Sequence, residues 1–135
     1  LNPLPGEIVA DCTLGYGGHA VEFVQRIGKT GKLIGLDVDG DQLERTKQRL
    51  SALCPEVPMA FYRSNFAGIA NIMRKEMPDG FDIIFADLGL SSMQIDDPDR
   101  GMSYRHDGPL DMRMDQRRKQ TAANLLNTLS EEALS

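Results

Sequence analysis

The chain has 135 residues, of which 41% are hydrophobic and 26% charged, as is typical of one globular domain with its own core. No apolar run reaches the roughly 18 residues that a membrane-spanning helix needs, and the first residues lack the features of a signal peptide. We therefore expect a cytoplasmic protein with no membrane partner. The two cysteines, Cys12 and Cys54, and the two histidines lack metal-ligand spacing, so we expect reduced thiols and no metal site.

The net charge of −5 by itself argues against a nucleic-acid partner. The charge is uneven, however, because residues 100–119 hold six Lys or Arg and only three Asp. Two interpretations of this basic stretch remain open. It could approach a phosphate backbone, or its arginines could pair with its own aspartates as part of a surface loop.

Four predicted strands alternate with helices along the chain. The strands are expected at residues 7–12, 32–37, 58–63 and 81–87, and the last is apolar on both faces. The intervening helices follow the glycines of 15–18, an Asp39 cap, and the segment around Ile69. This alternation predicts an α/β fold, a Rossmann-like doubly wound parallel sheet.

The alternation of predicted strands and helices stops at residue 88. Residues 88–119 show no hydrophobic period, and we expect a long functional loop there. A helix is predicted from about Thr121, and Ser130 looks like the cap of another. Sheets of this kind commonly have five or more strands. Because only four are predicted and no Met begins the chain, we expect a piece of a longer protein.

The segment DCTLGYGGHA, residues 11–20, lies between a strand and a helix. Glycines there let the backbone approach a ligand, and the helix start offers unpaired N–H groups. Gly15 and Gly17 with Ala20 also satisfy the dinucleotide pattern, which alone is weak. Asp11 favours the positively charged amino acid end of S-adenosylmethionine over a pyrophosphate, as does His19 in place of a small residue. A structural tight turn and an NAD site stay open as alternatives.

Two further residues are typical of a nucleoside site. Asp37 ends the second strand, 22 residues after Gly15, where an acid can accept both ribose hydroxyls. It therefore indicates a nucleoside without distinguishing the cofactor. Phe66 follows the third strand and could stack on adenine, although such a residue is more often part of the core.

Asp87 ends the fourth strand, at the edge of the sheet where ligands of such folds bind. An exocyclic amine of a base is a poor nucleophile, since its lone pair is delocalised into the ring. A carboxylate that accepts the amine hydrogens frees this lone pair, and in-line positioning supplies most of the rate. Asp87 is thus the candidate catalytic residue, with a helix-capping role as its alternative.

Residues 87–115, DLGLSSMQIDDPDRGMSYRHDGPLDMRMD, resemble the signature of the MraW/RsmH family of ribosomal RNA cytosine methyltransferases. The glycine segment 11–19 and the segment that ends at Asp37 match as well, so the resemblance covers essentially the whole chain. Mild departures are Met93, where Pro is common, and Met102, where Phe is common.

The resemblance implies methyl transfer from S-adenosylmethionine to the exocyclic amine of a cytidine in the decoding region of 16S ribosomal RNA, alone or within the small subunit. It also implies a fold of the class I methyltransferase type. The implied cofactor contacts fall on Gly17, Gly18, His19, Asp37, Phe66 and Asp87, and the resemblance adds Gln94. Asp11 and Gly15 complete the set from the pattern itself.

Residues 1–119 then form the N-terminal half of the cofactor domain, and residues 120–135 begin a helical insertion. Because the later strands are absent, we expect the isolated chain to be inactive.

The loop 88–119 would face RNA through Arg100, Tyr104 and Arg105. The rival functions are an NAD-binding oxidoreductase domain and a non-catalytic binding module with the same fold.

Overall fold

A computed structural model describes residues 1–134 and divides the chain into two compact units, Leu1–Leu88 and Gly89–Ser135. The first unit holds the sheet and the second holds short helices and turns. This division lies elsewhere than the expected boundary between residues 119 and 120. That boundary concerns the cofactor domain of a larger protein, and it stays a prediction.

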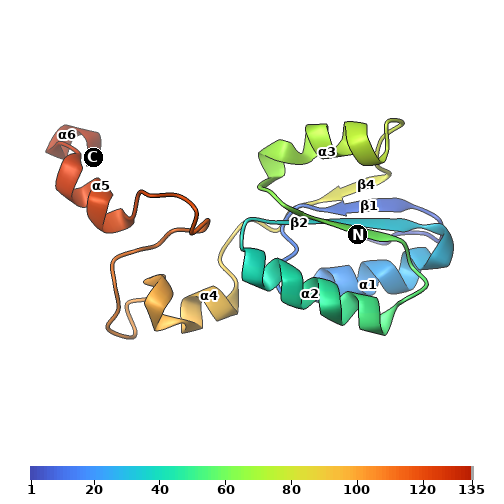
Figure 1. The fold of residues 1–135 in the computed structure, drawn as a ribbon, viewed down its shortest axis with the longest axis horizontal. Helices are drawn as coiled ribbons and strands as arrows, with labels where there is room; N and C mark the ends of the chain where they lie inside the picture. The colour runs from blue at the N-terminus through green and yellow to red at the C-terminus, as the bar shows by residue number, and fades with distance from the viewer. Residues whose placement is uncertain (135) are drawn as a thin grey trace. The chain divides into compact units, whose positions relative to one another are not determined.

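The first unit is a four-stranded parallel sheet in the order β3-β2-β1-β4 (Figure 1). Its strands are β1 (Ile8–Asp11), β2 (Lys32–Asp37), β3 (Met59–Arg63) and β4 (Ile83–Phe85). All four predicted strands are present and the predicted doubly wound fold is confirmed. β4 is shorter than the predicted 81–87 segment.

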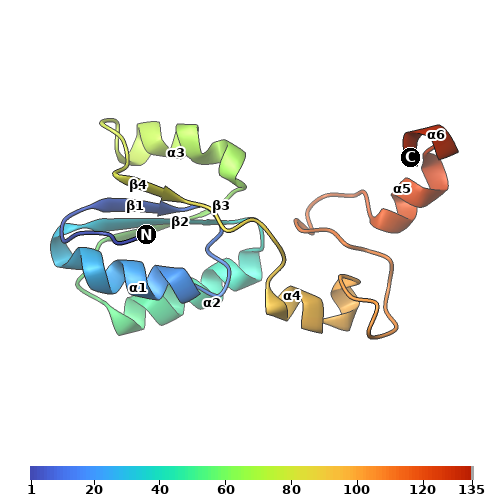
Figure 2. The same cartoon turned by 180° about the vertical axis from the view of Figure 1, so that it is seen from behind.

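Helices cover both faces of this sheet. α1 (Gly18–Ile27) and α2 (Gly40–Leu53) lie on one face and α3 (Ile69–Glu76) on the other (Figures 1 and 2). Neighbouring strand residues alternate between the two cores: Val9 packs with the α1 and α2 side chains, and Ala10 packs with Ile72 of α3. Burial on both faces is the reason that β1 and β2 are almost continuously apolar.

The helix starts follow from local chemistry. Asp39 caps α2, since its side chain accepts hydrogen bonds from the backbone N–H groups of Asp41 and Gln42, which confirms the predicted cap. Two 3₁₀ turns, η1 (Gly28–Thr30) and η2 (Phe66–Gly68), complete the first unit. Among the described residues β4 pairs only with β1, so it forms an edge, and its Ile84 is 56% exposed.

The second unit contains more regular structure than its sequence predicts. Residues 88–119 include a helix, α4 (Ser92–Asp96), and a 3₁₀ turn, η3 (Pro98–Arg100), which corrects the expectation of one irregular loop. Ser91 and Gln94 form a capping box that starts α4, but a helix of little more than one turn is too short to show a hydrophobic period.

The predicted helices after Thr121 and Ser130 are present as α5 (Ala122–Thr128) and α6 (Glu131–Leu134). Thr121 and Asn124 form a second capping box at the start of α5. Within residues 1–134, no helix is long and apolar enough to cross a membrane.

Candidate functional site

The candidate site lies at the carboxyl ends of the strands in the first unit. The chain proceeds from β1 to β2 to β3 in one direction, and β4 then pairs on the opposite side of β1. The order therefore switches between β1 and β4, the place where ligands bind in such sheets. Asp11 and Asp37 end β1 and β2, and Asp87 follows β4 by two residues.

Asp37 holds the glycine loop between β1 and α1. Its Oδ2 atom accepts a hydrogen bond of 2.7 Å from the backbone N–H of Gly15, and its Oδ1 atom accepts one of 2.9 Å from Asp39. Two carboxylate oxygens offer about four acceptor positions, so capacity remains for two ribose hydroxyls. The bond to Gly15 adds a second role, which the sequence does not reveal.

α2 supports the same loop through two residues that sequence reasoning missed. The Thr46 hydroxyl donates to the Gly15 carbonyl at 2.7 Å, and Arg49 donates to the Gly17 carbonyl at 3.2 Å. The Arg49 guanidinium also lies 4.5 Å from the centre of the Tyr16 ring. The loop sequence gives no sign of these partners, because they lie about 30 residues further along the chain.

The two adjacent glycines at the start of α1 differ in what they require. Gly17 has φ of 74°, and a Cβ atom there would lie 2.5 Å from the Thr46 Cγ2 atom, so the fold itself demands glycine. A Cβ atom at Gly18 would meet no protein atom within 4 Å. The space beside Gly18 is open to a ligand, next to the first-turn N–H groups that a helix leaves unpaired.

Asp11 is a buried acid beneath this loop. Its side chain is 1% exposed, and its Oδ1 atom accepts a hydrogen bond of 3.0 Å from the Thr13 N–H. Burial raises the pKa of Asp11 to about 6, although the Thr13 hydrogen bond lowers it in part. The charges of Asp37 and Asp87 contribute to the same rise in pKa. A cation bound nearby would stabilise the ionised form.

Asp87 presents its carboxylate to solvent at the switch point. The side chain is 71% exposed, and its Oδ2 atom lies 3.7 Å from the His19 Nε2 atom. The His19 ring packs against Phe85, with 4.8 Å between ring centres. Ser91 is the cap of α4, so the structure gives no support to a helix-capping role for Asp87.

Phe66 opens η2 directly after β3 and is 52% exposed. This exposure disfavours the alternative in which Phe66 belongs to the core. The backbone N–H of Ser64 donates to the Asp37 carbonyl at 2.9 Å. The segment that carries Phe66 is thereby tied to the end of β2.

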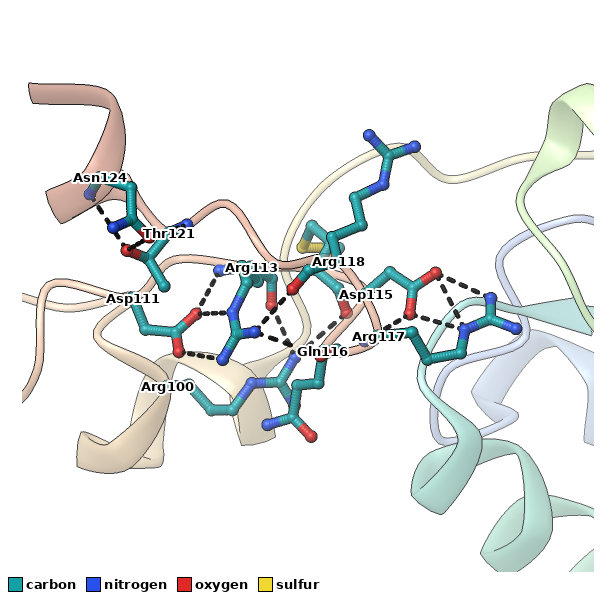
Figure 3. Close-up of polar contacts among 10 residues, drawn as sticks. Arg100, Asp111, Arg113, Asp115, Gln116, Arg117, Arg118, Thr121 and Asn124 are labelled. Atoms are coloured by element: carbon teal, nitrogen blue, oxygen red, sulfur yellow. Dashed lines mark hydrogen bonds and ion pairs between the residues drawn. The ribbon is translucent and has the colours of Figure 1, made fainter. Parts of the chain in front are cut away.

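The other predicted site residues lie in the second unit. Gln94 is buried, and its side-chain oxygen accepts a hydrogen bond of 3.0 Å from the Ser91 N–H. Tyr104 is 98% exposed and Arg105 is exposed as well. Arg100 is buried instead, and its guanidinium donates to the carbonyls of Arg113 and Met114 (Figure 3).

The basic stretch of the second unit is partly neutralised by its own acids. Arg113 forms a bidentate pair with Asp111, with both distances at 2.7 Å (Figure 3). Hydrogen bonds from Arg113 lower the pKa of Asp111 to about 2. Arg117 pairs with Asp115 at 2.7 Å in the same way. These two pairs confirm the intramolecular interpretation for part of the stretch, which leaves fewer arginines for a phosphate backbone.

The sequence profile of the MraW methylase family matches residues 1–135. A ribosomal RNA small subunit methyltransferase H from Desulfosudis oleivorans is 46% identical over 134 residues, 99% of this chain and 42% of that protein. Its counterpart from Lactiplantibacillus plantarum is 42% identical over 128 residues, 95% of this chain and 40% of that protein. The chain spans about two fifths of the length of these curated relatives.

Solved structures agree on the fold. A methyltransferase homologue from Pyrococcus horikoshii superposes with a TM-score of 0.53 at 27% identity, over 64% of this chain and 27% of that one. A chain from Thermoplasma acidophilum gives the same TM-score at 22% identity, over 64% of this chain and 35% of that one. The α/β sheet is therefore the Rossmann-like sheet of class I methyltransferases.

The raised pKa of Asp11 predicts a pH-dependent stability. The pKa of Asp11 is about 6 in the fold, against 3.8 for an unperturbed aspartate. The fold therefore loses stability as pH rises from about 4 to about 6, because over this range the unfolded chain ionises and the folded chain does not. Asp11→Asn keeps the acceptor for Thr13 but cannot ionise. Between pH 4 and 7.5 we expect the wild-type free energy of unfolding to fall by up to about 3 kcal/mol relative to Asp11→Asn. Denaturant titrations of both proteins measure this difference, and parallel pH profiles would contradict it.

Proposed function

The chain belongs to the MraW methylase family, and from this premise we propose that its first unit binds S-adenosylmethionine. The full-length protein would then transfer the methyl group to the exocyclic amine of a cytidine in the decoding region of 16S ribosomal RNA. The observation that carries the proposal is the gathering of Asp11, the glycine loop, Asp37 and Asp87 at the switch between β1 and β4. A ribosomal RNA substrate also implies a cytoplasmic location.

The residues of the first unit fit this cofactor. The open space beside Gly18 accepts a ligand at the start of α1, where backbone N–H groups suit the carboxylate of an amino acid. Asp11 supplies negative charge for the amino group and sulfonium, and Asp37 has acceptor positions for the ribose. The exposed Phe66 ring provides a surface for adenine. The cofactor supplies a methyl group on positively charged sulfur, which makes that methyl electrophilic.

Asp87 acts on the acceptor amine. Its exposed carboxylate can accept both amine hydrogens, which favours the pyramidal nitrogen and localises the lone pair for attack. The nitrogen becomes acidic as the new bond forms, so the proton can pass to Asp87 or to water without a strong base. Holding the amine in line with the methyl group supplies most of the rate.

Two residues of the second unit are proposed RNA contacts. Tyr104 and Arg105 are exposed within the segment 102–107, and an aromatic ring next to a cation suits an unstacked base and its phosphate. Gly101, with φ of 62°, closes this segment against the Pro109 carbonyl, where no Cβ atom could fit. The buried Arg100 supports the segment through the Arg113 and Met114 carbonyls, so we revise its expected phosphate contact to a structural role.

Asp87→Ala tests the catalytic assignment in the full-length protein. At saturating cofactor we expect single-turnover methylation of ribosomal RNA to slow by on the order of a hundredfold, as for loss of a positioned catalytic group. Asp79→Ala is the matched control, because Asp79 is an exposed carboxylate in the turn before β4, at the other end of the strand. A near-normal rate for Asp87→Ala would show that Asp87 is not catalytic.

Tyr104→Ala tests the RNA contact. We expect ribosomal RNA binding to weaken by roughly tenfold, since stacking on one aromatic side chain contributes about 1–3 kcal/mol. S-adenosylmethionine affinity and the unfolding temperature should stay unchanged, because the Tyr104 side chain is almost fully exposed. Tyr104→Phe should retain RNA binding. Wild-type RNA affinity for Tyr104→Ala, measured by filter binding or fluorescence anisotropy, would exclude this contact.

A further inference from the structure

Two hydrogen bonds join the end of β1 to the end of β4, and a third holds the turn that follows β1. The Cys12 N–H donates to the Phe85 carbonyl at 2.8 Å, the last bond in line with the parallel ladder. Beyond it, the Asp87 N–H donates to the Thr13 Oγ1 atom at 2.7 Å. The Thr13 N–H in turn donates to the buried Asp11 carboxylate at 3.0 Å. A side chain thus extends the connection between the two strands past the point where their backbones pair.

This connection reaches the residue that most needs a fixed backbone. The Asp87 carboxylate is 71% exposed, and an exposed side chain is held in place mainly by the backbone that carries it. β4 ends at Phe85, two residues before Asp87. The Thr13 hydroxyl is the group that fixes the Asp87 N–H at this point.

We propose that Thr13 is a positioning residue for the methyl transfer. Its hydroxyl sets the distance between the glycine loop, residues 12–17, and the Asp87 carboxylate. The proposal rests on the proposed function, because it takes Asp87 as the catalytic group. Thr13 belongs to the loop that begins at Asp11 and leads to the cofactor glycines. Its hydroxyl therefore couples the part of the site that holds the methyl donor to the part that holds the amine.

The backbone path of the glycine loop does not depend on the Thr13 hydroxyl. Leu14 donates to the Leu36 carbonyl at 2.9 Å, and Gly15 is held by Asp37 and Thr46 at 2.7 Å each. The bond from Thr13 to Asp11 uses the backbone N–H, which every replacement except proline retains. Removal of the hydroxyl therefore frees the Asp87 N–H and leaves the glycine loop in place.

Thr13→Val and Thr13→Ser test the proposal in the full-length protein. Valine keeps the shape and removes the acceptor, whereas serine keeps the acceptor and removes a methyl group. For Thr13→Val we expect kcat to fall roughly tenfold to a hundredfold. A shift of about 1 Å in the Asp87 carboxylate is enough for a loss of this size. KM and Kd for S-adenosylmethionine should stay within about twofold, since only the backbone at Asp87 is released. Thr13→Ser should restore kcat to within about threefold, and thermal unfolding checks that both variants are folded.

The outcomes separate this inference from the proposed function. A wild-type kcat for Thr13→Val beside a slow Asp87→Ala would overturn the positioning role and leave the catalytic role of Asp87 intact. An equal loss in Thr13→Val and Thr13→Ser, or a loss that appears only as weaker cofactor binding, would also overturn it. If Asp87→Ala is itself near normal, the proposed function fails first, and the inference fails with it.

Discussion

The site depends on one constraint, the fixed path of the backbone where β1 passes into α1. Three neighbouring elements hold this loop: Asp37 at the end of β2, Thr46 and Arg49 on α2, and the hydrogen bond between Thr13 and Asp87 beyond β4. The Gly15 and Gly17 carbonyls accept hydrogen bonds from α2, and the start of α1 is left for a ligand. Parallel strands make this possible, because their carboxyl ends meet at one edge of the sheet.

This arrangement constrains two residues, one through its backbone and one through its charge. Gly17 adopts a backbone conformation that other residues rarely take, against the methyl group of Thr46. Asp11 is buried with its pKa raised to about 6, and the negative charges of Asp37 and Asp87 lie close enough to contribute. Burial is the main cause of the raised pKa, and a positively charged ligand bound nearby would stabilise the ionised form of Asp11.

The sequence predicts the parts of this structure that depend on local pattern. All four strands follow from apolar runs between helices, and in β1 and β2 burial on both faces leaves little room for polar residues. The acids at the strand ends and the glycine loop follow from spacing along the chain. Thr46, Arg49 and the Thr13–Asp87 bond could not be predicted, because each joins residues 31 to 74 positions apart. The burial of Arg100 could not be predicted either, because a single buried arginine leaves no periodic signal.

The most direct test of the account is calorimetry with S-adenosylmethionine on wild type and Gly18→Val in the full-length protein. The two adjacent glycines make this informative: Gly17 serves the fold, whereas a Cβ atom at Gly18 would lie in open space. Gly18→Val should lose affinity for S-adenosylmethionine and S-adenosylhomocysteine by about a hundredfold or more, with its unfolding temperature within about 4 °C of wild type. Wild-type affinity in a folded Gly18→Val, or binding of NAD in place of both ligands, would contradict it.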